Sequence, residues 1–390
     1  MRSPSTTSII AMLLLARVGT ALADQPAAPE WGRIDDASAR VGRYAFVANA
    51  WPATGRLTVP AGFPQIVRAA AGPRDLVVEY NADATAIAVL APAGDPPGIV
   101  TIDTADATRQ FDDGRIVFTA LDARVEGDKA KLETHPGNHR IGYWSNPADC
   151  VAWTWKPTRW GAYDVRLTYS TASPSGGEIE VACGDVAVTG TLASTGGWYR
   201  YTSLPLGRLA IPTTAERTVR VRCTKPAGGA VMNLKAVTLE PACEGAPPRQ
   251  AADGTVLLHA RDATVRGTTL RWEPAEKKQT LGFWARPSDA AEWTFTLDAP
   301  GTFDVEVLQG CGTGQGGSEM AIDVDRGRPE AATLTFTVED TGGFQAFKPR
   351  TVGRVTLASA GEHVLRAQPQ TIAKGAACDI RQIRLVPVGK

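Results

Sequence analysis

The feature that most constrains this chain is an internal repeat. Residues 141–165 read IGYWSNPADCVAWTWKPTRWGAYDV and residues 281–305 read LGFWARPSDAAEWTFTLDAPGTFDV, so the two segments align without a gap at a shift of 140 positions. Downstream the shift grows to 146, because the TGGW of residues 195–198 matches the TGGF of residues 341–344. Two long copies indicate a duplicated domain rather than a solenoid, since each copy is large enough to enclose its own core.

The repeat divides the chain into segments. The two copies occupy residues 114–242 and 254–388, and the stretch CEGAPPRQAAD at residues 243–253 between them has the composition of a linker. Residues 28–113 lie outside the repeat and contain short apolar runs, including DLVVEY and AIAVL, which predict a smaller antiparallel sheet. At roughly 100–200 residues per domain, a chain of 390 residues can accommodate these three domains.

Both copies have the pattern of β-structure. Hydrophobic and polar residues alternate in VAWTW at residues 151–155 and in EWTFTL at residues 292–297, as they do in strands with one buried face. Turn-forming pairs such as Asn146-Pro147 and Pro300-Gly301 separate these runs, and the chain contains 39 Gly and 27 Pro. Many short strands at close spacing predict an all-β fold in which each domain is a β-sandwich.

The first 23 residues have the features of a secretory signal peptide. Ile9 to Ala16 form an apolar run too short to cross a bilayer, and Ala21-Leu22-Ala23 is an A-x-A cleavage site. We therefore expect cleavage near Ala23 and a secreted, periplasmic or cell-surface protein; the alternative is an N-terminal helical anchor. No later segment is apolar for long enough to predict a membrane span.

The cysteines, the histidines and the charge balance bear on disulfide bonds, metal sites and nucleic-acid binding. Export permits disulfide bonds, and we expect Cys183 to pair with Cys223 and Cys311 with Cys378, each pair within one copy. No metal site is expected, because the chain has no CxxC motif and only 4 His, none at ligand spacing from a cysteine. With 41 Lys and Arg against 41 Asp and Glu, the chain lacks the basic excess that nucleic-acid phosphates require.

Several motifs shared by the copies resemble carbohydrate-binding modules of families 6 and 35. They are an Ala-x-Asp-Ala…Gly start at residues 120–127 and 260–267, a Gly-aromatic-Trp…Asp…Trp run, the Thr-Gly-Gly-aromatic motif, and the ending Asn-Leu-x-x-Val-x-Leu at residues 233–239. The resemblance implies that each copy is a galactose-binding-like jelly roll. The expected fold is therefore one small antiparallel sandwich followed by two tandem jelly rolls.

The segment before the repeat resembles part of a different protein. AWPATGRLTVP at residues 50–60 and PPGIV at residues 96–100 resemble the small β-sandwich that follows the catalytic barrel of family-29 α-L-fucosidases. A barrel of that kind needs roughly 250 residues, which the segment ahead of the repeat does not supply. The chain thus resembles the accessory tail of an α-L-fucosidase or sulfatase without the catalytic domain.

The resemblance also implies where a sugar would bind, at loops on one end of each sandwich. Aromatic rings stack on the apolar C–H faces of sugars, while amide and carboxylate groups bind the hydroxyls. The matching positions are the aromatic pair after the first glycine, the aromatic residue after Thr-Gly-Gly and the polar residue that opens the last strand. They are Tyr143, Trp144, Trp198 and Asn233 in the first copy, and Phe283, Trp284, Phe344 and Asp379 in the second.

Other interpretations of these residues remain open. Trp144 and Trp284 are equally well explained as core residues. The second copy has Phe344 in place of Trp198 and Asp379 in place of Asn233, which weakens the expectation that it binds sugar. Trp153, Trp155, Trp293 and Phe295 lie on the alternating runs, and at least one aromatic residue of each pair is expected in the core.

We expect neither catalytic residues nor a cofactor. Glycoside hydrolysis needs a pair of carboxylates, but the recurrence of Asp149 as Asp289 in a duplicated fold is better explained by a turn cap. A structural calcium accompanies the resembling modules through two glutamates of the first strand, and both are missing here. Asp122 and Asp262 lie one position further on, so calcium is left open without support.

The sequence as a whole predicts an exported, non-catalytic protein that binds polysaccharide or oligosaccharide, with a fucosylated or sulfated glycan as one candidate. One alternative is a cell-surface scaffold whose sandwiches bind another protein. The other is a chain that resembles α-L-fucosidases through its accessory domains and has no activity.

Overall fold

The computed structural model describes residues 32–33, 42–47, 52, 54–60, 62–81, 86–91 and 99–389. Apart from two short 3₁₀ helices, η2 (Ala120–Asp122) and η3 (Ala260–Asp262), every regular element of the described residues is a β-strand. The all-β prediction is therefore confirmed. The predicted signal peptide lies outside the described residues.

The N-terminal unit contains two small antiparallel sheets, in the strand orders β1-β2-β8-β4-β5 and β6-β7-β3. Its strands are β1 (Gly32–Arg33), β2 (Arg43–Val47), β3 (Arg56–Val59), β4 (Ile66–Ala71), β5 (Arg74–Asp75), β6 (Val78–Tyr80), β7 (Ile87–Leu90) and β8 (Ile99–Thr104). Leu57, Val89 and Ile102 from different strands lie in the core between these sheets.

The first module is a sandwich with sheets in the orders β12-β13-β20-β15-β18 and β11-β14-β19-β16-β17, and β9-β10 extends the first sheet beside β20. Its strands are β9 (Arg109–Gln110), β10 (Ile116–Thr119), β11 (Arg124–Glu126), β12 (Lys131–Glu133), β13 (Arg140–Gly142), β14 (Cys150–Trp155), β15 (Gly161–Ser170), β16 (Gly177–Cys183), β17 (Val186–Leu192), β18 (Arg200–Ile211), β19 (Arg217–Pro226) and β20 (Asn233–Ala242).

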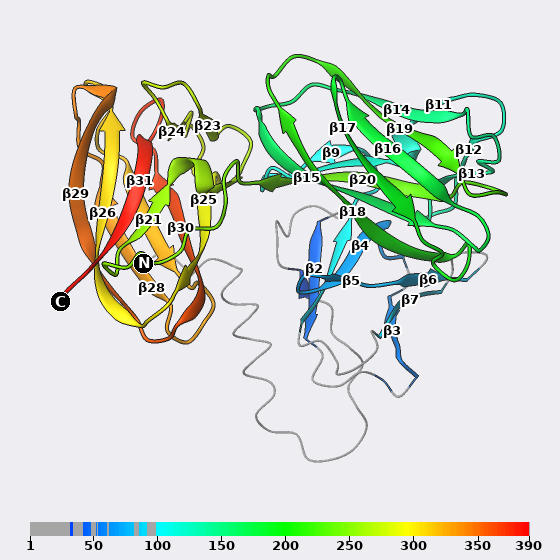
Figure 1. Ribbon diagram of the computed structural model, residues 1–390, viewed down its shortest axis with the longest axis horizontal. Coiled ribbons are helices and arrows are strands. Elements are labelled where there is room, and N and C mark those ends of the chain that lie inside the picture. The colour runs from blue at the N-terminus through cyan, green and yellow to red at the C-terminus, as the bar shows by residue number, and fades with distance from the viewer. Residues whose placement is uncertain are drawn as a thin grey trace.

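The second module repeats this topology without a counterpart of β9, in the orders β23-β24-β31-β26-β29 with β21 beside β31, and β22-β25-β30-β27-β28. Its strands are β21 (Val256–His259), β22 (Thr264–Arg266), β23 (Arg271–Glu273), β24 (Thr280–Gly282), β25 (Ala290–Leu297), β26 (Gly301–Cys311), β27 (Glu319–Val324), β28 (Ala332–Thr337), β29 (Gly343–Leu357), β30 (Gly361–Thr371) and β31 (Asp379–Pro387). Figure 1 shows it as a lobe beside the first module.

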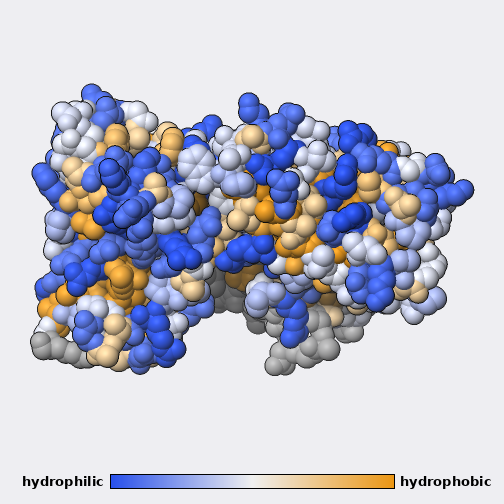
Figure 2. Space-filling model, turned by 45° about the horizontal axis from the view of Figure 1, so that its top comes forward, coloured by the Kyte–Doolittle hydropathy of each residue, from blue (hydrophilic) through white to orange (hydrophobic). Residues whose placement is uncertain are grey.

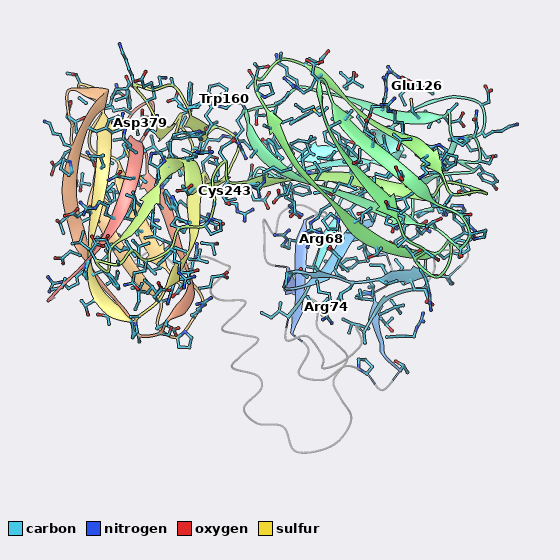
Figure 3. All side chains as sticks on the ribbon, in the orientation of Figure 1. Arg68, Arg74, Glu126, Trp160, Cys243 and Asp379 are labelled. Atoms are coloured by element: carbon cyan, nitrogen blue, oxygen red, sulfur yellow. The ribbon has the colours of Figure 1, made fainter. Side chains whose placement is uncertain are left out.

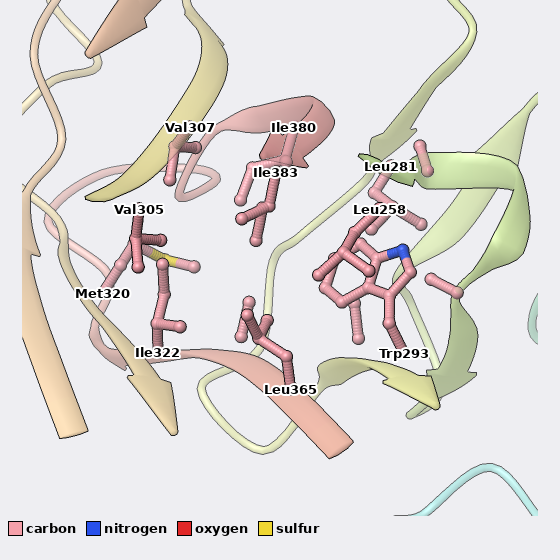
Figure 4. Packing of buried hydrophobic residues seen from close by; sticks show 14 of the residues in the cluster. Leu258, Leu281, Trp293, Val305, Val307, Met320, Ile322, Leu365, Ile380 and Ile383 are labelled. Carbon is pink, nitrogen blue, oxygen red and sulfur yellow. The ribbon is translucent and has the colours of Figure 1, made fainter. Parts of the chain in front are cut away.

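Each module has its own hydrophobic core. In the second module, Val305, Ile322 and Leu365 come from β26, β27 and β30 and point into the space between the two sheets (Figure 4). Trp153 and Trp293 are buried at equivalent places, and their indole N–H groups donate to the carbonyl oxygens of Thr119 and His259 at 2.9 and 2.8 Å. Trp155 and Phe295 are buried as well, so the expectation that at least one aromatic residue of each pair lies in the core is confirmed.

The N-terminal unit is joined to the first module by backbone pairing between two strands. This pairing was not predicted from the sequence. Strand β6 pairs with the start of β18, where Val78 faces Tyr201, so the smaller N-terminal sheet continues into the first sheet of the module. Strand β20 is consequently buried along almost its whole length, whereas the equivalent β31 keeps exposed positions. The two modules therefore share a topology but differ in what covers this sheet.

A buried aspartate fixes the same loop in both modules. The carboxylate of Asp149 accepts hydrogen bonds from the amides of Asp128, Lys129 and Ala130 at 3.0, 2.9 and 2.6 Å. Gly127 has a φ of +133°, and a Cβ at this position would lie 2.0 Å from Asp149 Oδ1. Because Asp289 accepts equivalent bonds in the second module, the interpretation of these aspartates as turn caps is confirmed.

The expected disulfides are absent, since all six cysteines are free thiols. Cys183 faces Val219 and Cys223 faces Ile179 on neighbouring strands, so these cysteines lie several positions apart along the sheet. A strand rises by roughly 3.4 Å per residue, whereas a disulfide needs Cα atoms within about 7 Å. Cys311 and Cys378 are both buried in the second core, where each packs as a small apolar residue.

Candidate functional site

Each module has a pocket at the same place, between the hairpin β12–β13 or β23–β24 and the start of the last strand. The first pocket has a volume of about 360 Å³ and the second about 220 Å³. The first is lined by Glu133, Arg140, Tyr143, Trp198, Tyr199, Ala230, Met232 and Asn233, and the second by Glu273, Lys278, Phe283, Phe344, Gln345, Ala376 and Asp379. Six of the eight predicted residues thus line the two pockets.

Tyr143 and Phe283 form the exposed aromatic wall of each pocket. Tyr143 is 61% exposed and Phe283 46% exposed, and both have positive φ angles, of 53° and 61°. Side chains with a Cβ avoid this left-handed region, and residues held in it cluster at functional sites. Figure 2 shows hydrophilic side chains with hydrophobic patches between them on the face drawn, and Tyr143 and Phe283 are among the few large hydrophobic side chains of the described residues that are exposed.

The prediction that Trp144 and Trp284 contact a ligand is wrong. Both side chains are 0% exposed and lie in the module cores, directly after the residues with positive φ. The left-handed turn directs the first aromatic ring outward and returns the next one to the core. The indole N–H of Trp284 donates to the carbonyl oxygen of Asp289 at 2.9 Å, which leaves this ring no role in contact with a ligand.

A carboxylate paired with a cation lies at the base of each pocket. In the first, Arg140 Nε and Nη2 donate to the two oxygens of Glu133 at 3.0 Å each. In the second, Lys278 Nζ donates to Glu273 Oε1 at 2.6 Å. A glycine on the neighbouring strand admits the carboxylate, because a Cβ on Gly142 would lie 2.1 Å from Glu133 Oε2.

The residue that opens the last strand differs between the pockets. Asn233 Nδ2 donates to the carbonyl oxygen of Trp198 at 3.1 Å, which ties the last strand to the loop that carries this aromatic residue. In the second pocket this position is Asp379, which is almost fully buried. Burial and the neighbouring carboxylate of Glu273 raise the pKa of Asp379 to about 7. The first pocket thus has a neutral amide where the second has a carboxyl group that titrates near neutrality.

A cation covers one face of each exposed ring. Lys131 Nζ lies 4.0 Å from the centroid of Tyr143, and the guanidinium carbon of Arg271 lies 3.8 Å from the centroid of Phe283. Such cation–π contacts stabilise the orientation of a ring by about 0.5–1 kcal/mol at exposed sites. One face of each ring is therefore occupied by its cation, and a ligand would stack on the other.

The N-terminal unit supports the loop of the first pocket. The backbone amide of Tyr80 in β6 donates to the carbonyl oxygen of Tyr199 at 2.9 Å, and Ser170 Oγ donates to the carbonyl oxygen of Trp198 at 2.8 Å. These bonds hold the two aromatic residues beside Asn233. Strand β29 instead begins at Gly343, so Phe344 of the second pocket lies within a strand.

The sequence analysis missed the charged residues of the pockets and the residues beside the loop aromatics. The missed residues are Glu133, Arg140, Glu273, Lys278 and Gln345, whereas Tyr199 belongs with Trp198 and Tyr201 to an aromatic cluster that the sequence suggests as a ligand platform. One signal was available, because KLE at residues 131–133 and RWE at residues 271–273 align at the same shift of 140 positions.

The donor sets of the described residues do not fit a metal ion. No group of three or more His, Cys, Asp or Glu side chains in this part of the chain is arranged to hold one. Asp122 accepts a hydrogen bond from Thr119 Oγ1 at 3.3 Å, and Asp262 accepts one from the amide of Ala246 at 3.3 Å. Both aspartates therefore bind groups of neighbouring segments. Within the described residues, no helix is long and apolar enough to cross a membrane.

Several solved structures of carbohydrate-binding modules are similar to part of this chain. A family 35 module from Clostridium thermocellum superposes on 32% of this chain and 96% of its own length, with 16% identity and a TM-score of 0.28. The C-terminal family 6 module of a laminarinase from Zobellia galactanivorans covers 32% of this chain and 98% of its own length, with 13% identity and a TM-score of 0.26.

One further similarity is to an enzyme. An α-L-fucosidase from Vibrio sp. strain EJY3 matches 52% of this chain with 13% identity and a TM-score of 0.24, and the chain spans 38% of that enzyme's length. No protein-family model matches the chain, and neither does any curated protein sequence. The strand orders described above establish the sandwich fold.

Proposed function

We propose that this chain is an exported, non-catalytic protein that binds polysaccharide or oligosaccharide in the two equivalent pockets. The observation that carries the proposal is the duplicated arrangement itself: an exposed aromatic ring, a second aromatic residue and a buried polar group surround the same cavity twice. Export is supported by the sequence features of residues 1–23.

The chemistry of the pockets suits a sugar ring. Tyr143 offers a free face for the apolar C–H groups of a sugar, and Trp198 lines the same cavity. The Glu133–Arg140 pair and Asn233 provide donors and acceptors for hydroxyl groups. A volume of about 360 Å³ falls within the usual range of about 300–1,000 Å³ for small-molecule pockets.

The charge arrangement supports binding without hydrolysis. Glycosidases keep one carboxyl group as acid and a second carboxylate as base or nucleophile, separated by about 5–9.5 Å. In the first pocket the carboxylate of Glu133 is occupied by Arg140, and no other carboxylate lines this cavity among the described residues. In the second, Glu273 is bound by Lys278, and a Cβ on Gly282 would approach both Glu273 and Asp379, so these two carboxyl groups adjoin one another.

Isothermal titration with soluble fucan, xylan, mannan and galactan fragments tests the proposal. We expect at least one glycan to bind, and the double variant Tyr143→Ala with Phe283→Ala to lose that binding. Leu257→Ala, which removes an exposed apolar side chain outside the pockets, is the matched control and should bind normally.

Two further results would decide against the proposal. Binding that survives in the double variant would place the site elsewhere, and binding to none of the glycans would favour the alternative of a scaffold that binds proteins. A chromogenic α-L-fucoside assay addresses catalysis separately, and we expect no turnover.

A further inference from the structure

The second pocket contains a carboxyl group that no side chain neutralises. Asp379 opens β31 at the end of the second module that carries the β23–β24 hairpin (Figure 3), and it lines the cavity although only 5% of the residue is exposed. In the part of the chain that the structure describes, no lysine, arginine or histidine forms an ion pair with this carboxyl group. Lys278, the cation among the residues that line the cavity, is bound to Glu273 instead.

A second acceptor lies beside Asp379. Lys278 Nζ donates to Oε1 of Glu273 at 2.6 Å, whereas Oε2 of Glu273 receives no hydrogen bond from the described residues. A Cβ on Gly282 would lie 2.3 Å from this Oε2 and 3.2 Å from Asp379 Oδ1, so the two oxygens converge beside the same glycine. The pocket thus holds two carboxyl groups and one lysine, and it lacks one positive charge when both carboxyl groups are ionised.

The other cations near the pocket do not fill this role. Arg271 stacks on the face of Phe283 that a ligand would not use, with its guanidinium carbon 3.8 Å from the ring centroid. Arg381 donates to the carbonyl oxygen of Lys278 at 3.0 Å and lies over the ring of Phe347. Neither guanidinium group therefore neutralises Asp379.

A proton takes the place of the missing cation. Burial and the like charge of Glu273 raise the pKa of Asp379 to about 7, although Lys278 and a hydrogen bond from Gln345 oppose the rise. Close carboxyl groups titrate in this way because both cannot ionise at low cost. A ligand that brings a positive charge can displace this proton near neutral pH.

The first pocket lacks this arrangement. Arg140 donates to both oxygens of Glu133, so neither oxygen is left without a donor. The position of Asp379 is taken by Asn233, a neutral amide that donates to the carbonyl oxygen of Trp198. The charges at the base of the first pocket are therefore balanced without a ligand.

We propose that the second pocket binds an amino sugar, a glycan unit whose free ammonium group donates to Asp379 and to Oε2 of Glu273 while its ring stacks on Phe283. This inference rests on the proposed function and names the glycan class that the second pocket selects. An ammonium group has three donors and no acceptor, which suits two carboxyl oxygens, and hydrogen bonds between charged partners are the stronger ones. Binding releases the proton of Asp379 to the buffer and leaves an ammonium–carboxylate pair.

The test uses the full chain in two backgrounds. Tyr143→Ala with Trp198→Ala disables the first pocket and isolates the second, and Phe283→Ala with Phe344→Ala does the reverse. The probes are oligosaccharides of glucosamine and of galactosamine, each compared with its N-acetylated form, which has the same backbone without the charge. Spermidine supplies ammonium groups without a sugar ring.

We expect the isolated second pocket to bind at least one amino oligosaccharide about tenfold more tightly at pH 7 than its N-acetylated form, as one charged hydrogen-bonded contact would provide. The preference should decrease with added salt and should be absent from the isolated first pocket. Spermidine should bind much more weakly, because it has no ring to stack on Phe283. Calorimetry at pH 6 in buffers of different ionisation enthalpy should show that the amino form releases a proton on binding.

Two substitutions of an aspartate by its amide separate the pocket from the rest of the module. Asp379→Asn should abolish both the preference and the proton release. Asp304→Asn removes a carboxylate of the same module that pairs with Arg354 outside the pocket, and it should keep both. Thermal unfolding of each variant verifies that the module is folded.

Three results would overturn the amino-sugar assignment: no preference for the amino forms in the second pocket, a preference that survives in Asp379→Asn, or binding of spermidine as tight as that of the amino oligosaccharides. Each leaves the proposed function intact if a neutral glycan of the fucan, xylan, mannan and galactan panel binds. Failure of every glycan to bind either background would instead contradict the proposed function, and the assignment would fall with it.

Discussion

Arg140 donates hydrogen bonds to both carboxylate oxygens of Glu133, each 3.0 Å long, at the base of the first pocket. The second module keeps the carboxylate as Glu273 but takes its cation from Lys278 in the preceding loop rather than from the position of Arg140. A largely buried carboxylate is costly unless a cation and hydrogen bonds compensate it. The pocket therefore requires a neutral pair at its base, and different positions of the repeat can supply the cation.

Replacing one member of this pair should destabilise the first module. Arg140→Met leaves the carboxylate of Glu133 unpaired, so we expect the free energy of unfolding to fall by about 2 kcal/mol. Denaturant unfolding followed by tryptophan fluorescence measures the change. Arg208→Met breaks the exposed pair with Asp164 and should cost less than about 1 kcal/mol. Equal losses in the two variants would show that the pocket pair has no special role in stability.

Because Tyr143 has a positive φ, a substitution at this position can remove ligand binding without destabilising the fold. Glycine adopts this conformation without strain, so Tyr143→Gly should leave the melting temperature unchanged or raise the stability by about 1 kcal/mol. The same change removes the aromatic wall, and binding to the first pocket should be lost in titrations with the second pocket disabled. A melting temperature well below that of the unchanged chain would mean that the ring serves the fold instead.

The repeat made most of the fold predictable. Two copies, which align without a gap over residues 141–165 and 281–305 and contain alternating residues such as Trp153 and Trp293, indicated the sandwich architecture. The resemblance to carbohydrate-binding modules identified Trp198 and Asn233, which line the first pocket. The orientation of Trp144 was not predictable, because the expectation came from the resembling aromatic pair after Gly142, and the left-handed backbone at Tyr143 sends the two rings of this pair in different directions.

Pairing between strands that are far apart in the chain was also not predictable from the sequence. The backbone pairing of Val78 with Tyr201 joins segments far apart in the chain, and no local pattern encodes which edge strand another segment will extend. The Glu133–Arg140 pair was missed for a related reason. Its residues lie on two strands of a short hairpin, and their meeting depends on the register between β12 and β13.

Replacing Lys235, which lies beneath the N-terminal unit, with a hydrophobic residue should stabilise the protein. Lys235 Nζ lies 3.6 Å from the Tyr80 centroid and 4.4 Å from the Tyr201 centroid, is fully buried, and has no hydrogen-bond partner among the described residues. Burial lowers the pKa of Lys235 well below its usual value. Lys235→Met fills a similar volume without the polar group, so we expect thermal unfolding to show a gain of about 1 kcal/mol.

The repeat offers a matched control for this change. Arg381 is equivalent to Lys235, but in the second module its guanidinium lies 3.9 Å from the Phe347 ring in a partly exposed position. Arg381 also donates to the carbonyl oxygen of Lys278 at 3.0 and 2.8 Å and to that of Lys277 at 2.9 Å, so Arg381→Met should lower the stability by about 1–2 kcal/mol, opposite in sign to Lys235→Met. Destabilisation by Lys235→Met would show that the cation contacts with the two tyrosines outweigh the cost of burial.

The second pocket should respond to pH through Asp379. Its carboxyl group has a pKa of about 7 in the folded chain against an ordinary value of 3.8, because of burial and Glu273. The folded state thus holds the proton more tightly than the unfolded state, so the stabilisation is fully present below about pH 4 and is lost as pH rises through about 7. The melting temperature of the second module should fall across this window, and Asp379→Asn should remove that part of the dependence.

The same titration should change ligand binding. Ionised Asp379 adds a negative charge beside the Glu273–Lys278 pair, so an anionic glycan should bind the second pocket more weakly at pH 8 than at pH 6. Asp379→Asn reproduces the amide that Asn233 provides in the first pocket, and its affinity should not vary with pH in this range. Titrations at pH 6, 7 and 8 with the first pocket disabled measure the effect. A pH dependence that persists in Asp379→Asn would assign the titration to another group.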